Sequence, residues 1–180
     1  MDNHARRLHW GYGYSCHVCL LRPKSIGHVG LNSADPFDAP SIDPNFLAHP
    51  DDLRGMVAGF KLTRRVMSAP AFQPYNLGEM FTADARTDEQ IVEALRRRAD
   101  NVYHPVGTCR MGSDPHAVVD PQLRVNGVEG LRVVDASVMP TVPGGHTNAP
   151  TIMIAERAAD LILGRPVLPP AELPQALAAE

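Results

Sequence analysis

Two histidines stand in loops whose composition suits proton transfer. His104 is followed by Pro105 and, two residues later, by Gly107, so the backbone that presents its imidazole follows a restricted path. His146 follows Gly145 and directly precedes a predicted helix, whose N-terminus favours developing negative charge. Imidazole is the side chain whose unperturbed pKa, about 6.5, lies nearest neutrality. Spacing alone leaves two interpretations open: a two-histidine acid–base site, or two loop histidines that satisfy turns.

A second pattern is the cysteine pair Cys16 and Cys19, which has the spacing of half a zinc site. A structural zinc needs four ligands, usually from two such pairs, and the third cysteine, Cys109, stands alone. We therefore expect two buried apolar cysteines, with a metal or redox pair as the alternative. An odd number of cysteines also favours a reducing compartment over a disulfide framework.

Three helices are predicted to position these loops. The first is an amphipathic helix that begins at Asp51 and ends before Pro70, and the second runs from a capping box at residues 87–90 to Arg98. The third runs over residues 149–163, where Pro150 occupies the first turn and glycine follows the last. The residues of this last helix that we expect to face the core are Ile152, Ala155, Ala159 and Ile162.

The rest of the chain is predicted to be short strands and loops. The 17 prolines and 14 glycines among 180 residues indicate many forced turns. Proline steps over residues 35–50 predict a loop there, because proline keeps the preceding residue out of the helical region. The predicted strands are residues 15–21, 29–31, 118–119 and 131–134.

Length and charge exclude several classes of protein. A chain of 180 residues is about one domain. Its net charge of −3 excludes a strongly basic nucleic-acid binder, so no nucleic acid is expected as a partner. Neither a long apolar run nor a secretory leader is apparent, and we expect a cytoplasmic protein without a membrane span.

Four ordered motifs around the two histidines resemble a known family. They are YHPVGTCRMG (103–112), VDPQLRV (119–125), GLRVVDASVMP (130–140) and NAPTIMIAERAAD (148–160), preceded by LLRPKS (20–25) and DDL (51–53). Together they closely resemble the C-terminal part of the glucose–methanol–choline (GMC) family of flavoprotein alcohol oxidoreductases, most of all its choline-dehydrogenase-like branch. The resemblance spans about residues 14–164.

This resemblance implies an α+β fold: the family's C-terminal, substrate-binding lobe, with a mostly antiparallel sheet covered by helices. The implied organisation is a lead-in over 1–13, the GMC C-terminal domain over 14–164 and a flexible tail over 165–180. The family's N-terminal Rossmann-like FAD lobe carries G-x-G-x-x-G, and the sequence contains no such motif. We therefore expect a fragment that is inactive alone and needs an FAD-binding lobe as its partner.

The function implied by the resemblance is FAD-dependent oxidation of the CH–OH group of a small-molecule alcohol, with hydride passing to flavin N5 and the proton to a histidine. His104 matches the family's catalytic base, and His146 matches its second active-site position, which is His or Asn. Two further pairs match cofactor-binding positions: Asp135 and Ala136 near the ribityl–pyrophosphate, and Thr147 and Asn148 beside the isoalloxazine ring.

Three further expectations can be checked. We expect the imidazoles of His104 and His146 to converge within about 4–8 Å, close enough to share one alcohol oxygen. Apolar surface around Val133, Val134 and Met139 should be exposed where a flavin lobe would pack. The alternative function is a non-catalytic binding module that retains the substrate lobe without a cofactor, and a weaker one is a zinc-binding domain.

Overall fold

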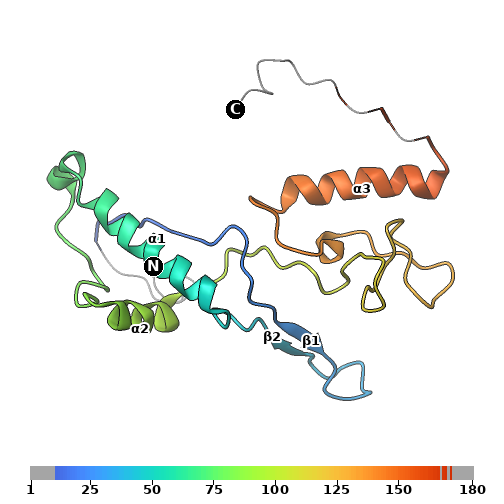
Figure 1. Ribbon diagram of the computed structural model, residues 1–180, viewed down its shortest axis with the longest axis horizontal. Helices are drawn as coiled ribbons and strands as arrows, with labels where there is room; N and C mark the ends of the chain where they lie inside the picture. The colour runs from blue at the N-terminus through green and yellow to red at the C-terminus, as the bar shows by residue number, and fades with distance from the viewer. Residues whose placement is uncertain (1–10, 167, 170, 172–180) are drawn as a thin grey trace. The chain divides into compact units, whose positions relative to one another are not determined.

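The computed structural model describes residues 11–166, 168, 169 and 171, which fall into two compact units that we treat separately. Unit 1 ends at His104 and unit 2 begins at Pro105. Unit 1 contains β1 (His28–Gly30), β2 (Ser41–Asp43), α1 (Pro50–Met67), the 3-10 helix η1 (Pro70–Tyr75) and α2 (Asp88–Arg98) (Figure 1). Unit 2 contains the 3-10 helix η2 (Ala136–Val138) and α3 (Asn148–Leu163). The predicted α+β class is confirmed.

Helix α1 forms where the apolar stripe predicted it. His49 caps its N-terminus, since its Nδ1 accepts a hydrogen bond from the Asp51 N–H at 3.1 Å. Proline at the first helical position has no N–H to leave unsatisfied. At the other end, the Ser68 N–H donates to the Arg64 carbonyl at 3.0 Å, so the helix closes before Pro70.

The strand predicted over residues 15–21 is wrong. These residues form no strand pairing and instead lie against α1. A Cβ added at Gly59 would come within 2.6 Å of Val18 Cγ2, and one added at Gly55 within 2.7 Å of Leu20 Cδ2. The two glycines, one helical turn apart, thus make room for two apolar side chains spaced two residues apart. The alternating pattern reflects packing on a helix rather than in a sheet.

Helix α2 packs on α1 and carries most of the core of unit 1. Its capping box is present: Thr87 Oγ1 accepts from the Gln90 N–H at 3.3 Å, and Gln90 Oε1 accepts from the Thr87 N–H at 3.0 Å. Arg98 follows the buried residues of α2 at helical spacing, but it is exposed. Its guanidinium lies 4.5 Å from the centre of the Phe81 ring. The buried cluster consists of Val57, Ala85, Ile91, Ala94 and Leu95.

The only sheet among the described residues is a two-stranded antiparallel one, in which Val29 of β1 pairs with Ile42 of β2. The strand predicted over residues 29–31 is confirmed one residue earlier in the chain. Strand β2, however, lies inside the segment that was predicted to be loop. Prolines bracket it, and the extended backbone that proline imposes on its predecessor is also the backbone of a strand.

A buried carboxylate joins the segment before β1 to helix α1. Asp52 is 4% exposed and accepts hydrogen bonds from the Lys24 N–H at 2.9 Å, the Ser25 N–H at 2.7 Å and the Ser25 hydroxyl at 2.6 Å. Burial acts to raise the pKa of Asp52, but the Ser25 hydroxyl and the two amides outweigh it, and the pKa lies below its ordinary value. The sequence places this acid in the first turn of a predicted helix and gives no sign of its partners, because they lie 27 and 28 residues away in the chain.

A second charged anchor ties the loop after η1 to α1. Arg64 donates from Nε and Nη2 to the Glu79 carboxylate at 2.5 and 2.7 Å, and also to the carbonyls of Thr82 and Ala85, both at 2.8 Å. Its guanidinium lies 4.7 Å from the centre of the Phe60 ring. The hydrogen bonds from Arg64 lower the pKa of Glu79 below its usual range.

Unit 2 contains single bridges where short strands were predicted. Val119, which is fully buried, bridges to Met111 in parallel and to Val125 antiparallel, and Arg124 bridges to Arg132. The runs over 118–119 and 131–134 therefore do not become strands. Prolines and glycines interrupt the chain after one or two paired residues, and Leu131 is half exposed.

The bounds and C-terminal stop of α3 are confirmed within one residue, with Gly164 at a left-handed φ of 65°. Its predicted core face is wrong. Ile154 and Ala158 are buried, whereas Ile152 is 55% exposed and Ala155, Ala159 and Ile162 are exposed as well. A helix that is apolar on several sides does not reveal by its periodicity which side the core will take.

The apolar residues on either side of the Asp135 turn are half-buried or buried. The predicted exposure of Met139 is wrong, because it is 6% exposed within the core of unit 2. Val133 and Val134 are half-buried and pack against the same core. The 1–13 lead-in and the 165–180 tail lie in large part outside the described residues. No helix in the described part of the chain is both long and apolar enough to cross a membrane.

Candidate functional site

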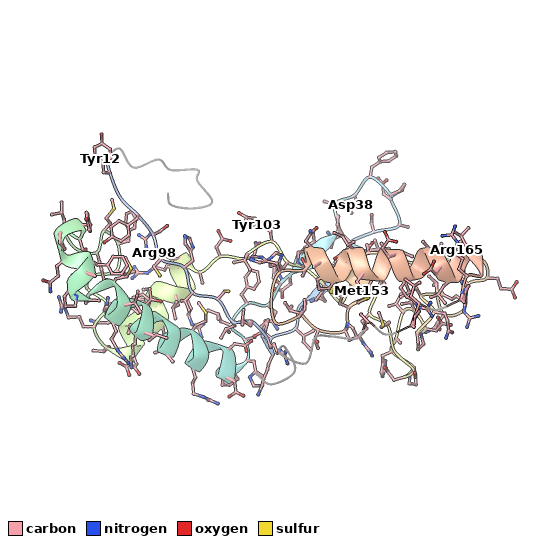
Figure 2. All side chains as sticks on the ribbon, turned by 90° about the horizontal axis from the view of Figure 1, so that it is seen from above. Tyr12, Asp38, Arg98, Tyr103, Met153 and Arg165 are labelled. Carbon is pink, nitrogen blue, oxygen red and sulfur yellow. The ribbon has the colours of Figure 1, made fainter. Side chains whose placement is uncertain are left out.

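His104 is the last residue of unit 1 and is half-buried. Tyr103, which precedes it and is labelled in Figure 2, adopts a left-handed φ of 60° that non-glycine residues rarely take. The Tyr103 N–H donates to Asn101 Oδ1 at 2.7 Å, which holds this turn. The chain therefore reaches His104 through a constrained turn, which lies before the Pro105 and Gly107 positions on which the prediction rested.

The segment after His104 is held by backbone hydrogen bonds. The N–H groups of Gly107 and Cys109 both donate to the Ser137 carbonyl at 3.0 Å, and the Met111 N–H donates to the Val138 carbonyl at 2.8 Å. Gly107 has a φ of +90°, which L side chains rarely adopt, so glycine is required for this path. No pattern of side chains in the sequence predicted these backbone hydrogen bonds.

Asp135 and Ala136 begin the turn whose Ser137 and Val138 carbonyls accept those hydrogen bonds. The Asp135 carboxylate accepts a hydrogen bond from the Ser137 N–H at 2.7 Å and so caps η2. Asp135 is exposed and Ala136 is half-buried. The turn thus exposes the Asp135 side chain to solvent, while its Ser137 and Val138 carbonyls accept hydrogen bonds from the segment after His104.

The third candidate region is the N-terminus of α3. Thr147 is buried, and its carbonyl accepts from both the N–H and the hydroxyl of Thr151, at 3.0 and 2.7 Å. His146 and Asn148 are exposed on either side of it. The first turn of the helix contains no acidic residue, so no carboxylate of that turn offsets the positive end of the helix dipole.

One apolar core joins three of these regions within unit 2. Val138 and Met139 follow the Asp135 turn, and they share a buried cluster with Ile154 and Ala158 of α3. Val106, just after His104, packs against this cluster. The structure therefore gathers the Asp135 turn, α3 and the segment after His104 around one core. His104 and His146 belong to different units, and their convergence stays a prediction.

One polar residue of α3 has a buried atom that the sequence did not predict. Arg157 is half-buried, and its Nη1 atom is buried with no hydrogen-bond partner among the described residues. Buried guanidinium N–H groups are normally paired. The only signal in the sequence was an arginine inside a mostly apolar helix, and that signal does not tell which side of the helix is buried.

The cysteine prediction is wrong, because Cys16 and Cys19 are both exposed, while Cys109 is partly buried. Val18 and Leu20 supply the contacts of this segment with α1 and leave the cysteines to solvent. Within the described ranges, no group of three or more His, Cys, Asp or Glu side chains is placed to hold a metal ion.

Comparison with known proteins finds relatives that match most of this chain. The family model described as GMC oxidoreductase matches residues 23–155. An alcohol dehydrogenase (acceptor) of Pseudomonas putida is 51% identical over 91% of this chain and 30% of its own length. An oxygen-dependent choline dehydrogenase of Cronobacter sakazakii is 46% identical over 88% of this chain and 28% of its own length. The chain thus spans less than a third of either relative.

Solved structures agree with the sequence relatives. Pyridoxine 4-oxidase from Mesorbium loti is 29% identical with a TM-score of 0.76, over 82% of this chain and 29% of its own. Formate oxidase of Aspergillus oryzae, described in connection with FAD modification, is 35% identical with a TM-score of 0.72, over 81% of this chain and 26% of its own. With a family model over most of its length and relatives that share its fold, this chain belongs to the GMC oxidoreductase family.

Proposed function

We propose that this chain forms the substrate-binding part of an FAD-dependent oxidoreductase that converts the CH–OH group of a small alcohol into a carbonyl. Its family membership and its likeness to alcohol and choline dehydrogenases support this reaction class. FAD is the cofactor named with the formate oxidase neighbour. When bound, FAD supplies the hydride acceptor, and the protein orients and polarises the reactants.

The residues present fit such a cofactor. The N-terminus of α3 carries no acid in its first turn and is flanked by the exposed Asn148 amide, which suits the electron-rich edge of a flavin ring. Thr147 and Asn148 are assigned to this edge. Asp135 and Ala136 are assigned to the ribityl–pyrophosphate region. The exposed Asp135 carboxylate has further oxygen lone pairs that can accept a hydrogen bond from a hydroxyl group.

We assign the proton transfer to His104. The neutral form of an imidazole can accept the hydroxyl proton of an alcohol at the ring nitrogen that carries no hydrogen, while the hydride leaves the carbinol carbon. His146, at the start of α3, is assigned either to donating a hydrogen bond to the developing alkoxide or to serving as a second base. Both roles require the two imidazoles to reach one oxygen atom, within about 3 Å of each.

The single observation that carries the proposal is the shared core of unit 2. It links the segment that follows His104 to the turn after Asp135 by three backbone hydrogen bonds, and both to the middle of α3, at Ile154 and Ala158, by buried apolar contacts. Residues from three separate motifs of the sequence are therefore held by one scaffold. A scaffold that orders several loops around one region is the usual basis of an active site.

We further propose that the chain acts together with an FAD-binding lobe. Glycine-rich turns at helix N-termini hold dinucleotide pyrophosphates, and the 180 residues contain no G-x-G-x-x-G. The relatives are more than three times longer than the part matched by this chain. The lobe would supply the adenine and pyrophosphate contacts, and this chain the ring-side ones.

The test is to combine the chain with the flavin lobe of a close relative, in trans or as a fusion. We expect a flavin absorption spectrum and turnover of a small alcohol from the pair and neither from the chain alone. In the pair, His104→Ala should lower kcat by about 10²–10⁴-fold, the usual contribution of a positioned base. His116→Ala, which alters an exposed loop histidine of unit 2, is the matched control and should leave kcat unchanged.

Each part of the proposal can fail separately. Equal turnover by the His104→Ala pair and the unsubstituted pair would refute the base assignment. A folded but colourless pair would favour the binding-module alternative. Tight FAD binding and turnover by the chain alone would refute the need for a separate lobe.

A further inference from the structure

The Asp135 carboxylate begins a series of hydrogen bonds that ends close to His104 in the chain. We propose that Asp135 is a positioning residue for the loop that carries His104, in addition to any contact it makes with a cofactor. The importance of this loop rests on the proposed function, but the hydrogen bonds themselves do not. The inference concerns three steps: a cap, a set of backbone bonds and a short covalent link.

The cap is the first step. Asp135 accepts from the Ser137 N–H through Oδ1 at 2.7 Å, and its own carbonyl accepts from the Val138 N–H at 3.3 Å. Helix η2 has only three residues, so it has no interior hydrogen-bond ladder to maintain its shape. The geometry of this turn therefore depends strongly on the side-chain cap.

The second step is the transfer of this geometry to the neighbouring segment. The Ser137 carbonyl accepts from two amides, those of Gly107 and Cys109, and the Val138 carbonyl accepts from the Met111 amide. Both acceptor carbonyls belong to the capped turn. A change in the orientation of the turn therefore moves both acceptors, alters three hydrogen bonds at once and shifts the whole 107–111 segment.

The third step is the short link back to His104. Only Pro105 and Val106 separate His104 from Gly107. The proline ring restricts φ, and Val106 packs against the buried core of unit 2. A shift of the 107–111 segment therefore displaces the two-residue covalent link that leads back to His104. A displacement of about 1 Å at a catalytic group is enough to cost about 10²-fold in rate.

The experiment is site-resolved amide hydrogen exchange, measured by NMR on the full 180-residue chain. Asp135→Ala should accelerate exchange at the amides of Gly107, Cys109 and Met111 by about 2- to 30-fold, the range expected for loss of one N-cap. Asp135→Asn keeps a side-chain oxygen acceptor and should restore most of the protection. Asp35→Ala removes a similar cap, the 2.9 Å bond from the Phe37 N–H in unit 1, and should leave the three amides unchanged.

The result that overturns the inference is unchanged exchange at the three amides in Asp135→Ala. Equal acceleration at the amides of Val125 and Asn126, which bond elsewhere in unit 2, would also overturn it by showing general destabilisation. Because exchange is measured without cofactor or substrate, this outcome is independent of whether His104 proves to be the base.

The reconstituted flavoenzyme provides the second readout. There, Asp135→Ala should lower kcat with little change in KM and with the flavin content retained, and it should cause no further loss in a His104→Ala background. Loss of flavin with an unchanged kcat per bound flavin would instead show that Asp135 acts only as a cofactor contact, and would overturn the positioning role.

Discussion

Each of the two units is stabilised internally by a different kind of interaction. Unit 1 is built from two regular helices, and charged side chains fasten its irregular segments to α1: Asp52 binds the segment before β1, and Arg64 binds the loop after η1. Unit 2 has one long helix, and backbone N–H groups fasten its irregular segments to one another. The first arrangement depends on a few charged side chains, whereas the second depends mainly on hydrogen bonds between main-chain groups, with the Asp135 side chain as a cap.

This difference has consequences for stability and for function. Side-chain anchors respond to pH and to single substitutions, because each depends on one ionised group. Backbone anchors tolerate many substitutions but require residues that permit the path, such as Gly107 with its φ of +90°. The candidate functional residues after His104 all lie in unit 2. The proposed site thus depends on main-chain geometry and on a small apolar core.

The largest expected effect breaks the core of unit 2. Ile154→Ala should lower the free energy of unfolding by about 2–5 kcal/mol, because it removes a buried side chain and leaves a cavity. Ile152→Ala is the matched control on the same helix, and its exposed side chain should matter far less. Urea unfolding of both variants measures the difference. Equal losses would contradict the face of α3 that the structure assigns to the core.

The next largest effect breaks an anchor of unit 1. Asp52→Ala leaves two amides and one hydroxyl without their acceptor and should cost about 1.5–3 kcal/mol, the usual value for hydrogen bonds to a charged group. Asp51→Ala, whose partly exposed carboxylate pairs with Lys24 and Arg54, should have little effect. Denaturant midpoints compare the two variants. A larger loss from the Asp51 change would refute the anchoring role of Asp52.

A smaller effect probes the apolar contact between α1 and residues 15–21. Gly59→Ala places a Cβ against the stiff Val18 side chain, and overpacking of about 1–3 kcal/mol should exceed the gain of about 1 kcal/mol in helix propensity. Gly55→Ala meets only the flexible end of Leu20 and should be neutral or stabilising. Thermal unfolding gives both values. If the contact exists, Val18→Ala should cost less in the Gly59→Ala background than in the unsubstituted chain.

The smallest expected effect is a difference in acid sensitivity. The pKa of Glu79 is lowered by its hydrogen bonds from Arg64, so the contribution of this pair is present above the ordinary value of 4.5 and is lost as the pH falls through the lowered pKa. Glu79→Gln should therefore flatten the dependence of unfolding free energy on pH below 4.5. Glu129→Gln, an exposed acid of unit 2, serves as the control. Identical pH profiles for the Glu79 variant and the unsubstituted chain would show that the pair adds no stability.

Local signals predicted the helices well. The Thr87–Gln90 capping box, the acids in the first turn of α1 and glycine after α3 each act within one turn of the chain, so no distant contact is needed to interpret them. The strand predicted over residues 15–21 failed because alternation does not specify its partner. Here the partner is a helix with two glycines, Gly55 and Gly59.

The candidate site shows the same division. The motifs around His104, Asp135 and Thr147 led to the GMC family, and the family model confirms that membership. The hydrogen bonds from the Gly107 and Cys109 amides to the Ser137 carbonyl could not be predicted from the types of side chain in these segments. Every residue except proline carries the same donor and the same acceptor, so a backbone contact between distant segments has no characteristic sequence.

Residue types and their order thus determined the family, the helices and their caps, and the residues proposed for chemistry. Tertiary structure alone decided which side of α3 is buried, what residues 15–21 pack against and how the 107–111 segment is tied to the Asp135 turn. The physical reason is the range of the interactions involved. Caps and helical periodicity act over a few residues, whereas burial and main-chain pairing depend on which distant segments meet.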